Sequence, residues 1–145
     1  MNDFLSFFVA GTPKPQGSST PMVSRSTGKA FLKTSPALAQ WRNTVVDRAL
    51  DAIADAGWER VEDAPVQVTL GFEFQRPKSH SKKRRESDNG WHYNRPDLDK
   101  LVRAVIDGLT VAGVWQDDGQ VSAITTDKSY DSRKGVYVTV ERLDR

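Results

Sequence analysis

Hydrophobic and polar residues alternate strictly over 66–74, so that valine, leucine and phenylalanine at even positions share one face. This alternation predicts a strand covered on one side only, which is typical of an antiparallel sheet. Further strands are predicted at 4–9, 121–128 and 136–141.

Two helices are predicted from apolar residues that recur every three or four positions. The first covers 36–56, where Thr34 or Ser35 can cap the helix ahead of Pro36 and Gly57 can end it. The second runs from 97 to 112. The element order predicts an α+β fold: a single domain over 1–145, with a mixed, mainly antiparallel sheet and two main helices packed on it.

Two segments show no regular spacing of hydrophobic residues. Residues 10–30 combine glycine, proline, serine and threonine, and residues 75–95 combine basic residues with serine and glycine. We expect both to be flexible basic loops. At about 20 residues the second segment exceeds an ordinary connector, so it is either functional or disordered.

The amino-acid composition excludes several kinds of covalent link, metal site and nucleophile. The 145 residues include no cysteine and only two histidines, His80 and His92, which excludes disulfides, thiolate metal sites and cysteine nucleophiles. The histidines are interpreted as ordinary loop residues.

No apolar run approaches the ~20 residues of a membrane span. We expect a soluble cytoplasmic protein that does not bind membranes, and we assign Trp41, Trp58 and Trp115 to the core.

The net charge of +2 is unevenly distributed. Residues 76–95 include seven basic residues and two acidic ones. The net charge of this segment is therefore +5, and that of the rest of the chain is −3. A basic segment on an acidic body predicts local contact with a polyanion. Aromatic residues in it, Trp91 and Tyr93, could stack on unpaired bases. Alternatively, Trp91 packs against the sheet and the lysines are only solvated. The candidate DNA-binding residues are Arg76, Lys78, Lys82, Lys83, Arg84, Arg85, Trp91, Arg95 and Lys100.

Aspartates gather around the second helix. Asp97 and Asp99 flank Leu98 at its start, and Asp117 and Asp118 form a turn after its end. The simpler interpretations are helix capping and a hairpin turn. If the turn folds back beside the helix start, the carboxylates converge, and one of them must take up a proton unless a cation lies between them. Oxygen ligands alone suit Mg²⁺ or Mn²⁺.

Residues 94–128 resemble the corresponding stretch of a known protein family. The run Arg95-Pro-Asp-Leu-Asp99, the following helix and the run Gly113-Val-Trp-Gln-Asp-Asp-Gly-Gln-Val121 resemble the RusA-type Holliday junction resolvases, which phages and prophages typically carry. The resemblance implies a homodimeric, Mg²⁺-dependent endonuclease of branched DNA that nicks four-way junctions symmetrically in recombination and repair; Mn²⁺ could substitute.

The resemblance also implies residue roles. The catalytic metal ligands fall on Asp97, Asp99 and Asp118, with Asp117 as a possible helper. Arg103 stands where the family has a lysine, and Lys100 stands where it has an asparagine.

Lys128 matches a strand lysine of the family. Lys128 or Arg103 would stabilise transition-state charge. Alternatively, Arg103 forms helical ion pairs with Asp99 and Asp107. Rival functions are a non-cleaving branched-DNA binder and a nuclease that prefers flaps or forks.

Overall fold

The structure, a computed structural model, describes residues 2–17 and 20–144. Its centre is a sheet of four strands: β1 (Phe4–Ala10), β4 (Val66–Phe74), β5 (Val121–Tyr130) and β6 (Gly135–Arg142). The strand order is β1-β6-β4-β5. β6 is antiparallel to both β1 and β4, whereas β5 is parallel to β4. The predicted mixed, mainly antiparallel sheet is confirmed.

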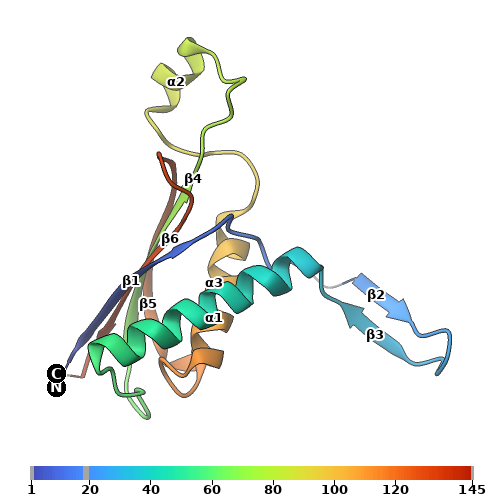
Figure 1. Ribbon diagram of the computed structural model, residues 1–145, viewed down its shortest axis with the longest axis vertical. Helices are drawn as coiled ribbons and strands as arrows, with labels where there is room; N and C mark the ends of the chain where they lie inside the picture. Colours follow the sequence, from blue (N-terminus) through green and yellow to red (C-terminus); the bar gives the residue numbers. More distant parts are fainter. Residues whose placement is uncertain (1, 18–19, 145) are drawn as a thin grey trace.

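Two helices, α1 (Pro36–Ala56) and α3 (Leu98–Ala112), pack on the sheet (Figure 1). The Ser35 side chain caps α1 by accepting a hydrogen bond from the Leu38 amide, and Gly57 ends the helix with a left-handed φ of 63°. Even positions of β4 are fully or almost fully buried, while odd positions are only partly covered. One face of the sheet therefore carries the core, as its alternation predicts, and the predicted α+β class is confirmed.

The core includes the three tryptophans assigned to it, Trp41, Trp58 and Trp115. The two helices approach closely at Gly108, where a Cβ atom would lie 2.9 Å from Cγ1 of Val45. Such a contact leaves no space for a side chain. Among the described residues, no helix is both long and apolar enough to cross a membrane.

Both segments expected to be loops contain regular structure. In the first, β2 (Thr20–Val23) pairs with β3 (Ala30–Lys33) as a hairpin that projects from the domain (Figure 1). Residues 18–19 of this segment lie outside the described residues. In the second, α2 (Lys82–Asp88) stands beyond the end of β4. Its sequence, KKRRESD, is entirely polar. No hydrophobic period could therefore reveal this helix.

The relative position of the candidate site residues depends on the path of the chain after α3. Gly113 ends the helix, and a short turn leads through the 3₁₀ helix η1 (Asp118–Gln120) into β5. α3 is about 22 Å long at 1.5 Å per residue. The seven residue steps from 121 to 128 in β5 cover about 23 Å. The start of β5 therefore lies near the end of α3, and Lys128 lies near its start.

Candidate active site

Asp97 and Asp99 occupy the start of α3. Asp97 is the N-cap residue, yet its side chain makes no capping hydrogen bond, and it is half exposed. Lys100 Nζ lies 3.6 Å from Asp97 Oδ2. Within the described part of the chain, no hydrogen bond or ion pair reaches the Asp99 carboxylate. Both carboxylates thus remain accessible as oxygen ligands, and the capping interpretation does not describe the Asp97 side chain.

Lys128 reaches the same end of α3 from β5. Its ammonium donates to the carbonyl oxygens of Asn94 and of Pro96, the latter at 2.7 Å. Burial lowers the pKa of Lys128, and the nearby negative charge of Asp97 partly opposes this effect. Lys128 therefore holds the backbone just before Asp97. Its two carbonyl contacts suit a positioning role.

Arg103 is exposed one turn further along α3. The ion pairs with Asp99 and Asp107 that the helical spacing allows are both absent from the described residues. Asp107 is instead held by Gln16, whose Nε2 donates to the carboxylate. The guanidinium of Arg103 is consequently available to an external anion.

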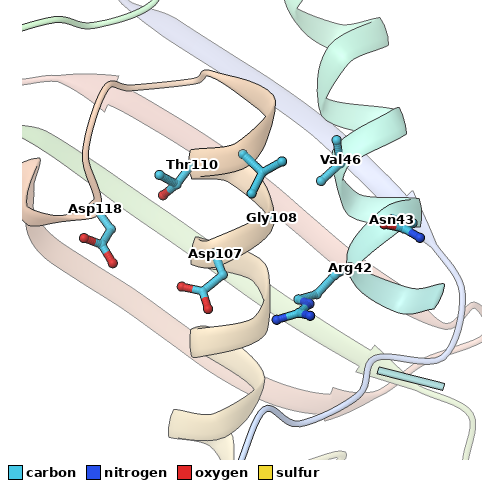
Figure 2. A pocket seen from close by; sticks show the side chains of 8 residues that line it. Arg42, Asn43, Val46, Asp107, Gly108, Thr110 and Asp118 are labelled. Carbon is cyan, nitrogen blue, oxygen red and sulfur yellow. The ribbon is translucent and has the colours of Figure 1, made fainter. Parts of the chain in front are cut away.

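Asp117 and Asp118 behave differently from each other. Asp117 accepts a 3.0 Å hydrogen bond from the Gly119 amide and forms a capping box with Gln120. Its carboxylate is thus engaged by the turn. Asp118 is exposed and helps to line a pocket of about 460 Å³ between α1 and α3. Figure 2 shows Asp118 on one side of Asp107 and the Arg42 guanidinium on the other.

The expected convergence of three or four aspartates does not occur within one chain. No group of three acidic or histidine residues that could hold a metal is found among the described residues. The physical reason is the length of α3, because the turn packs beside its end and leaves Asp97 and Asp99 at its start. Asp118 lies beside Asp107 and Thr110 instead.

A network that the sequence did not reveal ties the N-terminal segment to both helices. Arg42 Nη1 donates to Gln16 Oε1 at 3.1 Å, and Gln16 in turn contacts Asp107. The Gln16 amide also donates to the Lys100 carbonyl at 2.9 Å. The three side chains come from segments that are distant in sequence. No spacing or motif could have indicated this network.

Two predicted DNA-binding residues are engaged inside the protein. Arg76 donates two hydrogen bonds, of 2.7 and 2.8 Å, to Asp88, whose side chain is fully buried. Arg84 donates to Asp88 at 3.2 Å and to Asn94 at 2.6 Å. Hydrogen bonds from Arg76 above all hold the pKa of Asp88 well below its usual range. Arg76 and Arg84 therefore fix α2 in place.

The remaining cations of this segment face solvent. They are Lys78, Lys82, Lys83, Arg85 and Arg95. Trp91 and Tyr93 are 54% and 65% exposed, so neither ring is buried in the core, although residue 91 forms a backbone bridge to Ser129 of β5. Arg84 lies 4.3 Å from the centre of the Tyr93 ring. Exposed cations and aromatic rings together form a surface suited to a nucleic acid backbone and its bases.

A small pocket of about 320 Å³ joins this surface to the start of α3. Asp97, Lys100, Arg95, Pro96 and Pro15 line it. The arrangement places two accessible carboxylates beside cations, which is the combination that phosphodiester hydrolysis with a divalent metal needs. The basic surface supplies the contacts for a polyanionic substrate.

Comparison with known proteins agrees with this chemistry. A search of curated proteins found no match. Residues 12–141, nearly the whole chain, match the family described as Endodeoxyribonuclease RusA. This family hydrolyses phosphodiester bonds of DNA and acts as a Holliday junction endonuclease, which implies branched DNA as substrate and a divalent metal requirement. The chain belongs to the RusA endodeoxyribonuclease family.

Proposed function

We propose that this protein is a Mg²⁺-dependent resolvase that cuts four-way DNA junctions by paired symmetric nicks during recombination and repair. The observation that carries the proposal is the pair of accessible carboxylates, Asp97 and Asp99, at the edge of a basic surface. Resolution requires two nicks, so we further propose a homodimer with one active site for each strand.

The carboxylate oxygens of the candidate site are the type of ligand that a hard cation binds. Asp97 and Asp99 offer carboxylate oxygens, the ligands that Mg²⁺ prefers, and the chain contains no cysteine that would favour a softer metal. Bound Mg²⁺ would polarise the scissile phosphate and lower the pKa of a water molecule. Mn²⁺ has similar ligand preferences and is expected to substitute.

One chain does not bring Asp118 to this pair, because α3 separates them. A twofold axis that passes beside the middle of α3 would place the end of one helix near the start of the other. We therefore propose that Asp118 from one copy completes the ligand set with Asp97 and Asp99 of the other. The dimer is then needed for each metal site as well as for the second nick.

The remaining residues bind and orient DNA. Arg95 and Lys100 border the pocket at Asp97, where they can hold the phosphates that flank the cleaved bond. Arg103 is exposed on the same helix and keeps its charge at every working pH. It therefore contributes to the site by charge, without proton transfer. Lys128 keeps the backbone of residues 94–96 in position.

A mixing experiment tests the shared site. Neither Asp99→Asn nor Asp118→Asn alone should nick a labelled four-way junction with Mg²⁺. A refolded mixture of the two should regain nicking, because a mixed dimer with shared ligands contains one intact site. If each site were built within one chain, both sites of a mixed dimer would stay inactive.

A control variant tests whether the loss of cleavage is specific to the proposed site, and two control substrates test whether cleavage is specific to junctions. Asp127→Asn removes an exposed carboxylate on β5 and should leave cleavage unchanged. Linear duplex and flap substrates should remain uncut by the wild-type protein. Cleavage of flaps with no cleavage of junctions would contradict the proposed substrate and favour the rival nuclease activity.

A further inference from the structure

The hairpin of β2 and β3 projects from the domain beyond the first turn of α1 (Figure 1). Its two strands form a sheet of their own and, in the described part of the chain, make no extensive contact with another helix or strand. Val23 is 66% exposed. A lone two-stranded hairpin is only marginally stable and buries little surface. The hydrophobic core therefore does not account for this element, whose surface is open to a partner.

The tip of the hairpin, residues 24–29, is held in shape by its own hydrogen bonds. The Ser24 amide donates to the Lys29 carbonyl at 2.9 Å, and the Gly28 amide donates to the Ser24 carbonyl at 2.8 Å. The hydroxyl oxygens of Ser24 and Thr27 accept from the amides of Thr27 and Lys29, both at 3.3 Å. Gly28 has the left-handed φ of 69° that this turn requires. The tip thus presents its side chains on a defined backbone.

The side chains of the tip are chemically suited to a polyanion. The tip sequence, SRSTGK, has no acidic and no hydrophobic residue, and every side chain in it carries a hydrogen-bond donor. Arg25 and Lys29 are exposed, and neither side chain forms a hydrogen bond or an ion pair with another described residue. Arginine, lysine, serine and threonine are among the side chains that bind DNA phosphates. The tip therefore offers a set of unused donors for phosphate oxygens.

The charge of the surrounding chain favours the same class of partner. From Phe4 to Val46 the sequence contains five basic residues and no acidic one. Within α1, acidic residues occur only in the second half, at Asp47, Asp51 and Asp55. The hairpin lies at the opposite end of α1 from the chain termini (Figure 1). A polyanion is therefore attracted to the hairpin end of α1 rather than to its other end.

The chain leads into the hairpin from the candidate active site. Pro15 lines the pocket at Asp97. A Cβ atom on Gly17 would lie 3.8 Å from Cδ of Lys100. Arg25 follows Gly17 by eight residue steps, which span at most about 27 Å. One turn of duplex DNA is about 34 Å long. The tip can therefore contact a duplex only within the first turn from the cleaved phosphate.

We propose that the hairpin of β2 and β3 is a second DNA-binding element, whose tip contacts the phosphates of one duplex arm of the substrate within one turn of the cleaved bond. Arg25 and Lys29 supply the charge, and the hydroxyl groups of the tip donate to phosphate oxygens. A two-stranded ribbon also fits the major groove, which is about 12 Å wide.

This contact rests on the proposed function and deepens it. The hairpin and the basic segment 76–95 are separate surfaces on either side of the start of α3. Two surfaces beside one active site can hold two arms of a branched DNA, whereas a linear duplex occupies only one of them. The hairpin is therefore expected to contribute to the preference for branched DNA.

The absence of cysteine in the chain permits a test that does not depend on cleavage by the protein. An iron chelate attached to Ser26→Cys, in the inactive Asp99→Asn protein, generates hydroxyl radicals at the tip. It should cut one arm of a bound four-way junction within about one turn of the branch point. The same chelate on Asp55→Cys, an exposed position near the other end of α1, is the matched control and should leave the DNA uncut.

Arg25→Gln with Lys29→Gln supplies a second readout. The slope of log affinity for the junction against log salt concentration should fall in magnitude by up to about 2, one contact for each cation. This double variant should also lose more affinity for the junction than for a linear duplex. Arg60→Gln with Arg142→Gln removes the same charge from paired side chains elsewhere and should bind both DNAs as the wild type does.

The outcomes separate the hairpin contact from the proposed resolvase activity. Cuts from the Ser26→Cys chelate in a junction that the wild type does not nick would support the hairpin contact and overturn the resolvase activity. Nicking by the wild type, with no cuts from this chelate in the bound junction, would overturn the hairpin contact alone and favour a protein partner. Equal cutting from both chelates, or an unchanged salt slope in the double variant, would also overturn it.

Discussion

At the scale of single residues, the site separates charges that hold the protein together from charges that face solvent. Asp88 is buried beneath Arg76 and Arg84, and Lys128 donates to two backbone carbonyls. These groups pair within the protein because an unpaired buried charge is strongly unfavourable. Asp97, Asp99 and Arg103 do not share this constraint, so their charges remain available to a metal or to DNA.

His92 predicts a pH dependence of stability. Its ring stacks on Tyr130 at 4.7 Å between centroids, and burial followed by the charge of Lys128 lowers its pKa. The folded protein thus binds protons less readily than the unfolded chain. The resulting stabilisation is complete above the unfolded pKa of about 6.5 and is lost as the pH falls through the lower, folded value.

We therefore expect the melting temperature to fall on acidification below about pH 6.5, and His92→Phe to weaken that decline. Calorimetry across a pH series measures both. The pKa of His80 is also lowered, chiefly by burial and next by Arg84, so some decline should persist in His92→Phe. An unchanged pH profile in a variant lacking both histidines would contradict this assignment.

At the scale of elements, the attachment of α2 depends on one carboxylate. The helix has seven residues, too few to be stable alone, and its only buried residue is Asp88. The Arg76 guanidinium also lies 4.4 Å from the centre of the Tyr130 ring, which ties the base of the segment to β5. The position of the basic surface therefore depends on Asp88.

Asp88→Asn should release α2 and weaken junction binding. The neutral amide cannot balance Arg76 and Arg84, so two cations would be left facing each other. We expect a clear loss of junction affinity, measured by fluorescence anisotropy, with a smaller change in the rate of cleavage at saturating enzyme. Glu86→Gln, which alters an exposed carboxylate on the same helix, is the matched control. Equal effects of both variants would show that net charge alone matters.

Elements with a hydrophobic period were predicted from the sequence, and elements without one were missed. α1 and α3 both present apolar residues every three or four positions, and their predicted ends agree with the structure within a residue. Strand β2 and the polar helix α2 both lie in segments that were expected to be loops. Their order comes from pairing and from the buried ion pair, and neither leaves a local pattern.

At the scale of the whole molecule, the basic surface and the start of α3 lie at one end of the sheet, away from the two chain termini (Figure 1). The cations concentrated there are expected to contact DNA phosphates. Each phosphate contact contributes about 0.9 to the slope of log affinity against log salt concentration for duplex DNA.

Replacing Lys82 and Lys83 by glutamine should reduce the salt slope of junction binding by up to about 2, if each contacts one phosphate. Arg60→Gln with Arg142→Gln removes the same charge elsewhere, from side chains already paired with Glu62 and Asp144, and should leave the slope unchanged. Binding measured at several salt concentrations gives both slopes. Equal slopes in the two double variants would place the DNA elsewhere.

The sequence by itself determined the strands and helices of the main layer, the choice of Asp97 and Asp99 as accessible carboxylates, and the family. These follow from local periodicity and from a motif within one stretch of chain. Only the tertiary structure decided that Asp118 lies at the other end of α3, that Asp117 caps a turn and that Arg76 and Arg84 face inward. Such outcomes depend on the length of a helix, the direction of the next strand and the need to neutralise a buried charge, which involve residues distant in sequence.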